Sequence, residues 1–118
     1  MNRLSLGTAQ FGMSYGIANT TGRVPRDELS GILDLCNENK IDTIDTAISY
    51  GNCETLLGKV SCNNFKLVTK IPSIPIKNTN NEGNWIKNQI EKSLERLGVS
   101  NIYAILLHRS NELQKHSV

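Results

Sequence analysis

Ile41-Asp-Thr-Ile-Asp-Thr-Ala-Ile-Ser-Tyr-Gly-Asn-Cys-Glu-Thr-Leu-Leu-Gly58 is the stretch from which the fold is predicted. Three of its first four residues are β-branched, which is typical of a short buried strand, and Asp45 follows where such a strand should end. Tyr50 comes five residues later. A turn then leads to Asn52, which is suited to cap a helix that begins at Cys53. Asp45 and Tyr50 are therefore expected in one loop between a strand and a helix.

A carboxylate and a phenol in such a loop are candidates for proton transfer, because active sites gather at the carboxyl ends of parallel strands. A structural interpretation is equally open for the pair alone. Asp45 could accept hydrogen bonds from loop amides, and Tyr50 could be a half-buried aromatic residue. The rest of the chain has to decide between the two interpretations.

Strands and helices alternate along the remaining sequence. Runs of β-branched and apolar residues predict strands, and apolar residues spaced i, i+3, i+4 and i+7 predict helices. The predicted strands are residues 4–8, 41–45, 65–71 and 102–107, and the predicted helices begin near Pro25, Cys53 and Asn84, the last one ending at Gly98. The strand 102–107 is almost wholly apolar, which is typical of a strand buried on both faces. About four parallel strands and three helices, an α/β fold, are therefore predicted in one domain, residues 1–118.

Two connections are long. The segment after the first strand is rich in glycine, which suits either backbone that passes close to a ligand or another chain, or a plain connecting loop. Residues 73–83 contain proline and several asparagines, and they are expected to form an exposed connection.

Three predicted strands end in residues with reactive side chains, namely Asp45, Lys70 and His108. Each has a structural alternative: Lys70 could reach solvent as an edge lysine or turn inward to Asp45, and a lone histidine is more often structural than catalytic. Parallel strands deliver their carboxyl ends to one rim, and Tyr50 joins that rim from its loop. Four different chemical groups at one rim favour a functional site.

Composition excludes several classes of function. The chain has 13 basic and 11 acidic residues, a net charge of +2, and no cluster of basic residues, so no nucleic-acid partner is predicted. It lacks the apolar run of a signal peptide and the about 20 apolar residues of a membrane span, so no membrane contact and a cytoplasmic location are expected. Cys36, Cys53 and Cys62 have neither zinc-site nor disulfide spacing, and reduced thiols are expected.

The motifs resemble those of the aldo/keto reductase family. Asp-Thr-Ala-Ile-Ser-Tyr-Gly-Asn-Cys-Glu at residues 45–54 is similar to the family signature Asp-Thr-Ala-x-x-Tyr-Gly-x-Ser-Glu, with Cys53 at the usual serine. Further matches are Gly7-Thr8, Val68-Thr-Lys-Ile, Ser93-Leu-Glu-Arg-Leu-Gly-Val and Leu106-Leu-His. The opening Thr8-Ala-Gln-Phe-Gly is similar to bacterial members associated with sugar-nucleotide and polysaccharide pathways. Lys40 stands near a customary glycine, and Tyr103 where an aspartate is common.

The resemblance implies a reductase mechanism with NADP(H). Tyr50 would protonate a substrate carbonyl, Lys70 would be the cation beside it, Asp45 would hold Lys70, and His108 would orient the substrate. Gly7, Thr8 and Asp45 would lie at the nicotinamide end of the cofactor. A free phenol has a pKa of about 10, so a nearby cation suits this role at neutral pH. No metal is implied.

This chain is shorter than the members of that family. Its members are complete (β/α)8 barrels of about 250 residues, whereas this sequence matches only the N-terminal half of such a TIM barrel. The missing half carries most of the NADP site, so weak or absent cofactor binding and no activity alone are expected. The alternative is a catalytically silent half barrel with only an assembly role. Two open sheet edges and an apolar inner face predict a homodimer, or a complementary half-barrel partner.

Overall fold

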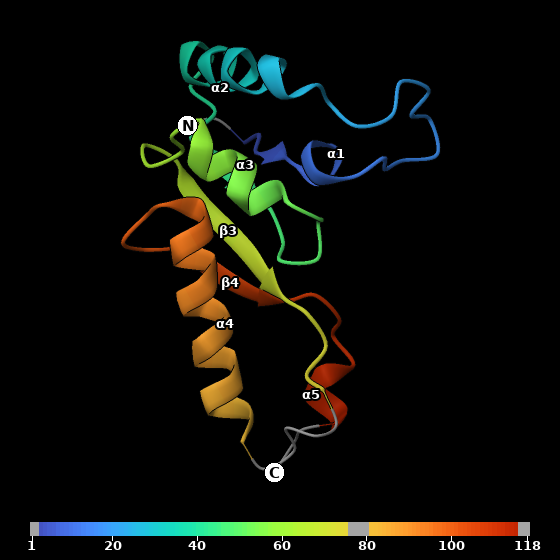
Figure 1. The fold of residues 1–118 in the computed structure, drawn as a ribbon, viewed down its shortest axis with the longest axis vertical. Helices are drawn as coiled ribbons and strands as arrows, with labels where there is room; N and C mark the ends of the chain where they lie inside the picture. Colours follow the sequence, from blue (N-terminus) through green and yellow to red (C-terminus); the bar gives the residue numbers. More distant parts are fainter. Residues whose placement is uncertain (1–2, 76–80, 116–118) are drawn as a thin grey trace.

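A four-stranded parallel sheet forms the centre of the computed structural model, which describes residues 3–75 and 81–115 (Figure 1). The strands lie in the order β1-β2-β3-β4, and each pairs only with its neighbours in sequence. Their bounds are Leu6–Gly7 (β1), Thr43–Asp45 (β2), Lys66–Ile71 (β3) and Ala104–Leu107 (β4). The prediction of four parallel strands in an α/β fold is confirmed, although all four strands are shorter than predicted.

Three longer helices connect the strands, as predicted. They are α2 (Leu29–Glu38), α3 (Cys53–Lys59) and α4 (Glu82–Leu97). The one-turn elements α1 (Ala9–Gly12), η1 (Arg26–Glu28) and α5 (Glu112–Lys115) were not predicted separately. Single turns are too short to show an apolar period of 3.6 residues, so sequence patterns do not reveal them.

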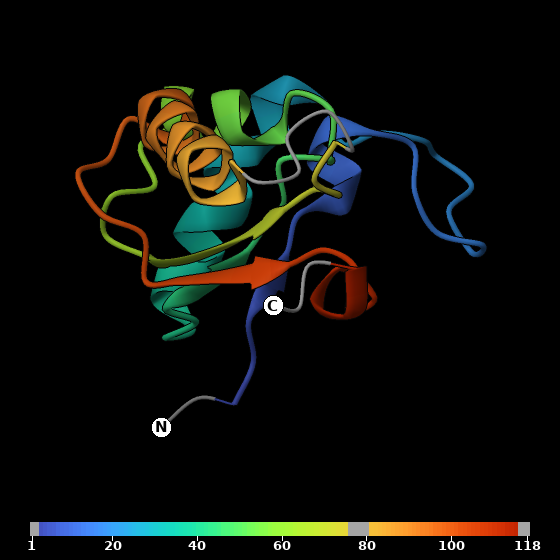
Figure 2. The ribbon, with the colours of Figure 1, turned by 90° about the horizontal axis from the view of Figure 1, so that it is seen from below.

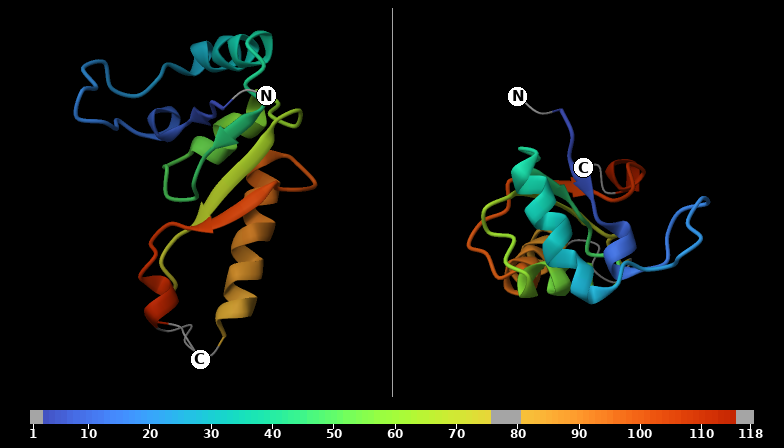
Figure 3. Two further views of the ribbon diagram at one scale, coloured as in Figure 1. Left: turned by 180° about the vertical axis from the view of Figure 1, so that it is seen from behind. Right: turned by 90° about the horizontal axis from the view of Figure 1, so that it is seen from above.

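The longer helices cover one face of the sheet and leave the other face open (Figures 2 and 3). Alternate strand residues point to the helices, because side chains alternate across a strand. Ile44 and Leu67 lie on this helix face and pack with Leu57 of α3 and Leu97 of α4. All four are almost wholly buried, so the hydrophobic core lies between the sheet and its helices.

The open face corresponds to the interior of a barrel, and its composition is mixed. By strand register it carries Gly7, Thr43, Asp45, Lys66, Val68, Lys70, Ala104 and Leu106. The expectation of an apolar inner face is therefore wrong. Two lysines and an aspartate stand where a purely structural core would have hydrocarbon.

β4 is not buried on both faces, contrary to prediction. Ile105 and Leu106 are 37% and 47% exposed. Within the described part of the chain, β4 pairs with β3 alone and no strand lies on its other side. The apolar composition of β4 therefore exceeds what its present neighbours can bury.

Helix ends follow the predictions only in part. Gly98 ends α4 in the left-handed conformation (φ 66°), as predicted. The prediction that Asn84 caps α4 is wrong: Asn81 holds the N-cap position, and the Asn84 amide donates a hydrogen bond to Asn81 Oδ1 at 2.7 Å. Asn52 does precede α3, but its side chain makes no capping hydrogen bond.

Lys40 has the left-handed conformation that usually requires glycine, with φ 58°. The backbone N–H of Ile41 bonds the carbonyl of Cys36 at 2.8 Å across this turn, which closes α2. The carbonyl of Leu94 accepts the same kind of bond from Val99 where Gly98 ends α4. Lys40 therefore adopts a turn geometry that glycine usually takes, at a conformational cost of about 1–2 kcal/mol.

Two further predictions concern the state of the cysteines and contact with a membrane. Cys36, Cys53 and Cys62 are free and buried. None of the helices in residues 3–75 and 81–115 has the length and apolar character needed to cross a bilayer. The prediction for the connection 73–83 falls partly on residues 76–80, which lie outside the described residues.

Candidate active site

Three strands and one loop bring the predicted site residues to the same rim of the sheet. Asp45 is the last residue of β2, Lys70 lies one residue before the end of β3, and His108 directly follows β4. Tyr50 lies in the loop between β2 and α3. The parallel register aligns these strand ends, so the four side chains form one cluster.

Lys70 turns inward instead of reaching solvent. Its Nζ donates hydrogen bonds to Asp45 Oδ1 and, at 2.9 Å, to the carbonyl oxygen of Thr46. The Lys70 side chain is 17% exposed and that of Asp45 39%. The ammonium group also lies 5.3 Å from the centre of the Tyr50 ring. A cation thus stands beside the phenol, held there by a carboxylate.

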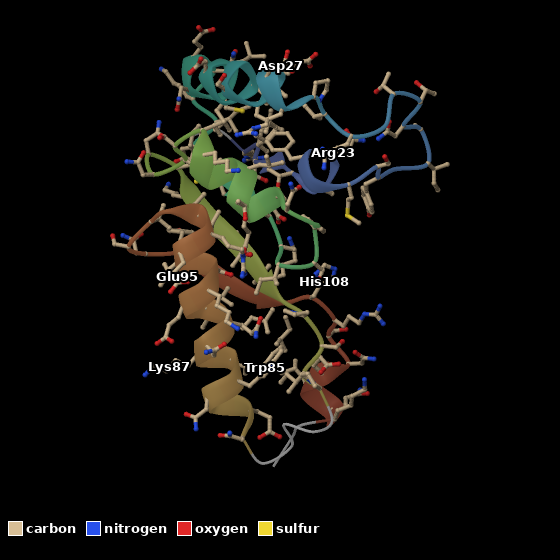
Figure 4. All side chains as sticks on the ribbon, in the orientation of Figure 1. Arg23, Asp27, Trp85, Lys87, Glu95 and His108 are labelled. Atoms are coloured by element: carbon tan, nitrogen blue, oxygen red, sulfur yellow. The ribbon has the colours of Figure 1, made fainter. Side chains whose placement is uncertain are left out.

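His108 completes the cluster on the other side of Tyr50. The two ring centres are 5.9 Å apart and the ring planes meet at 83°, an edge-to-face arrangement. The His108 backbone N–H donates to the Ile71 carbonyl at 2.9 Å, which fixes the start of the loop after β4. Its Nδ1 is buried and has no hydrogen-bond partner within the described residues. His108 lies beyond the end of β4 in Figure 4.

Gly7 and Thr8 lie at the same rim, beside Asp45. The Thr8 backbone N–H and hydroxyl both donate to the Asp45 carbonyl, at 3.1 and 2.9 Å. These bonds fix the end of β1 against the end of β2. A pocket of about 280 Å³ opens here, lined by Gly7, Thr8, Ala9, Gln10, Tyr15, Asp45 and Tyr50.

A second pocket lies on the His108 side of the cluster. It has a volume of about 310 Å³ and is lined by Ser49, Pro72, Ser73, His108 and Arg109. These residues come from the loops that follow β2, β3 and β4. Tyr50 and His108 therefore stand between two hollows, one at the β1 side of the rim and one at the β4 side.

The glycine-rich loop after α1 has a defined structure. One side chain, Asn19, makes four hydrogen bonds within it: the amide donates to the carbonyls of Tyr15 and Gly22, and Oδ1 accepts from the N–H groups of Thr21 and Gly22 at 3.0 and 2.7 Å. Gln10 Nε2 donates to the Tyr15 carbonyl at 2.8 Å and ties the loop to α1. Tyr15 is thereby held at the edge of the first pocket.

Sequence reasoning did not identify the role of Glu54, which is 2% exposed. It accepts hydrogen bonds from Thr69 of β3 and from Ser93 and Arg96 of α4. The available signal was a carboxylate two residues before Leu56 and three before Leu57, which are both core residues, so that Glu54 lies in the first turn of a buried helix. Cys53 beside it is also buried, and burial raises the pKa of its thiol. Cys53 is therefore a neutral hydrogen-bonding group and not a nucleophile.

The four clustered residues have the chemistry of a proton donor with an adjacent cation. In the described residues, no group of His, Cys, Asp and Glu side chains is arranged to hold a metal ion. Comparison with protein families matches residues 3–115 to the aldo/keto reductase family model. The chain belongs to the aldo/keto reductase family.

Solved aldo/keto reductase structures have the same fold. Two structures of a Pseudomonas aeruginosa protein named as an aldo-keto reductase superpose with TM-scores of 0.73 and 26% identity, covering 93% and 97% of this chain and 45% of theirs. Aldose reductase from Giardia lamblia superposes with a TM-score of 0.61 at 17% identity, covering 90% of this chain and 32% of its own. No curated protein matched the chain.

These relatives are more than twice as long as the matched region, since this chain spans 45% of the Pseudomonas aeruginosa protein. The four strands and their helices correspond to the N-terminal half of an aldo/keto reductase TIM barrel. The half-barrel prediction made from the motifs is confirmed.

Proposed function

We propose that this chain supplies the proton-donating half of an NADP(H)-dependent carbonyl reductase. The observation that carries the proposal is the position of Tyr50, with the Lys70 ammonium 5.3 Å from its ring and the His108 ring 5.9 Å away. A phenol beside a held cation is suited to give a proton to an oxygen that gains negative charge.

Each of the four residues has one task in the proposed reaction. The cofactor, when bound, supplies a hydride to the carbonyl carbon of the substrate. Tyr50 donates its hydroxyl proton to the carbonyl oxygen, and the product is an alcohol. His108 donates a hydrogen bond to that oxygen and orients it. Lys70 stabilises the tyrosinate that remains, and Asp45 holds Lys70 in place through their hydrogen bond.

The first pocket suits only one end of the cofactor. Gly7 lies at its edge, and a Cβ atom added there would meet no atom within 4 Å, so a flat ring can approach the backbone. Among the described residues that line the pocket, Asp45 is the one charged residue, and none is a lysine or arginine. Gly7, Thr8 and Asp45 therefore suit the nicotinamide end, whereas the phosphates need cations from elsewhere. Weak NADPH binding by this chain alone follows.

Complementation tests the proposed reaction. The chain is co-expressed with the part of the Pseudomonas aeruginosa aldo-keto reductase that follows its fourth strand, and consumption of NADPH is measured with a set of aldehydes. Activity that is lost in Tyr50→Phe and retained in Tyr103→Phe, a change at a 68% exposed tyrosine outside both pockets, supports the assignment. Equal activity in both variants would show that Tyr50 is not the proton donor.

The second candidate function is assembly without catalysis. Its support is the two outer strands, β1 and β4, each of which pairs on one side only within the described residues. A two-fold axis would bring β4 of one copy beside β1 of the other with all strands parallel, which closes a ring of eight. We propose a homodimer of this kind, with a complementary half barrel as the competing partner.

A further inference from the structure

Glu54 is a buried acidic residue, 2% exposed, and it joins three elements. Thr69 of β3 donates to Glu54 Oε1 at 2.7 Å, and Ser93 of α4 donates to the same oxygen at 3.0 Å. Arg96 Nε donates to Oε2 at 2.8 Å, and a second guanidinium nitrogen lies 2.7 Å from that oxygen. The carboxylate at the start of α3 is thus bound to the strand that carries Lys70 and to the helix after it.

The hydrogen bond between Thr69 of β3 and Glu54 connects α3 to the strand that carries Lys70. Thr69 and Lys70 are consecutive on β3, so their side chains point to opposite faces of the sheet. Thr69 binds Glu54 on the helix face, while Lys70 binds Asp45 on the open face. Through Thr69, the start of α3 is therefore fixed one residue away from the cation of the site.

Cys53 anchors the same turn of α3 to the other side of the site. Its Sγ donates to the Thr8 carbonyl and accepts from the Thr46 hydroxyl, both at 3.3 Å. Thr8 and Thr46 flank Asp45 in space and in sequence respectively. The first turn of α3 is thus attached to β1 and β2 by Cys53 and to β3 by Glu54.

Tyr50 is connected to that turn by a rigid backbone. The Cys53 N–H donates to the Tyr50 carbonyl at 3.1 Å, and the Tyr50 N–H donates to Ala47 at 3.1 Å. Gly12 passes so close that a Cβ atom on it would lie 1.7 Å from the Tyr50 carbonyl oxygen. A shift of α3 along the sheet would therefore move Tyr50 with it, because these hydrogen bonds and the close approach of Gly12 fix the turn between them.

We propose that Glu54 is a positioning residue, which places Tyr50 within the cluster through its hydrogen bond with Thr69. It touches neither substrate nor cofactor. The inference rests on the proposed function, because the position of Tyr50 relative to Lys70 matters when Tyr50 acts as the proton donor. A plain structural ion pair between α3 and α4 is the competing explanation, and it needs Arg96 and Ser93 but not Thr69.

Two matched variants separate these explanations. Thr69→Val keeps the shape of the side chain and removes only the bond between Glu54 and β3. Ser93→Ala removes the hydrogen bonds from Ser93 of α4 to both Glu54 oxygens, together with the one that Ser93 accepts from Arg96. Both leave the Arg96 pair intact, so both should fold, and each unfolding midpoint is measured to confirm it.

The readout is the proton NMR signal of the His108 ring, recorded in a His116→Gln background in which His108 is the remaining histidine. Tyr50 lies edge-on to His108 at 5.9 Å, so its ring current shifts that signal. Tyr50→Leu gives the size of this contribution. The experiment needs no cofactor or turnover, so failure of the reductase assay leaves it valid.

Thr69→Val should move the His108 signal by at least about a third of the change caused by Tyr50→Leu, whereas Ser93→Ala should leave it in place. Unchanged signals in both variants, or equal changes in both, would overturn the proposal and leave Glu54 a structural residue. A Glu54→Gln variant that folds with an unshifted His108 signal would overturn it as well.

Discussion

Charged side chains on the two faces of the sheet differ in their hydrogen-bond partners and in their exposure to solvent. On the helix face, Glu54 is 2% exposed and receives hydrogen bonds from three side chains of its own chain. On the open face, Asp45 and Lys70 have mainly each other, and the Asp45 side chain remains 39% exposed. The helix face therefore carries a fully paired buried charge, and the open face carries Asp45 and Lys70 of the candidate site.

Loss of Arg96 should have the largest effect on the helix face. Arg96→Met leaves the buried Glu54 carboxylate without its cation and should cost about 3 kcal/mol, the low end for a broken buried pair because the Arg96 side chain is 33% exposed. Lys87→Met is the control, since Lys87 projects from the outer side of α4 and lies 4.0 Å from Glu91 (Figure 4). It should cost less than about 1 kcal/mol. Urea unfolding measures both, and equal losses would contradict the contrast.

A methyl group between α3 and α4 should have the next largest effect. A Cβ atom on Gly58 would lie 2.2 Å from the backbone carbonyl oxygen of Arg96, so Gly58→Ala should cost about 1–3 kcal/mol by forcing the helices apart. Gly31→Ala in α2 meets no atom within 4 Å and should instead stabilise the chain by about 0.5–1 kcal/mol. Thermal unfolding of the two variants should shift in opposite directions, and a stable Gly58→Ala protein would refute the close helix contact.

Glu112, at the start of α5, makes a smaller contribution to the stability of the fold, and this contribution depends on pH. The Ile74 backbone N–H donates to its carboxylate at 3.0 Å, and this hydrogen bond lowers the pKa of Glu112. A carboxyl with a lowered folded-state pKa stabilises the fold above its unfolded pKa, and that stability is lost as pH falls through the folded value. The stability difference between the natural chain and Glu112→Gln should therefore shrink in acid, below pH of about 4. A difference that is constant from neutral to acidic pH would exclude this contact.

The smallest effect on stability, but a large one on assembly, is expected at β4. Leu106 is 47% exposed on the open face, so Leu106→Ser should change the free energy of unfolding by less than about 1 kcal/mol. If two copies pair through their outer strands, the same change should reduce the sedimenting mass from dimer to monomer. Leu35→Ser, 58% exposed on α2, should leave the mass unchanged. A natural chain that sediments as a monomer at micromolar concentration would refute the homodimer.

The sequence was sufficient for the elements whose pattern is local. The β-branched run before Asp45, the apolar stripe of α2 and Gly98 at the end of α4 each predicted an observed feature. The shared rim of Asp45 and Lys70 followed from the parallel strands, whereas the contact between their side chains was left open by the strand pattern and was implied only by the family resemblance.

Features that depend on distant neighbours were missed. Nothing near Glu54 in the sequence indicates that Thr69, Ser93 and Arg96 surround it, because these partners lie 15 to 42 residues away. The exposure of β4 was misjudged for a related reason. An apolar run shows what a strand can bury, whereas actual burial depends on whether a neighbour covers it.

The strand order has a consequence for how the chain acquires its structure. Because β1, β2, β3 and β4 pair strictly in sequence, each new unit can dock on the one synthesised just before it. Each strand of the described sheet pairs with the strand before it in sequence, so the entropy cost of closing the connecting loops stays low. On a ribosome the sheet can grow one strand at a time from β1, and the rim with Asp45, Lys70 and His108 is complete only when the last unit arrives.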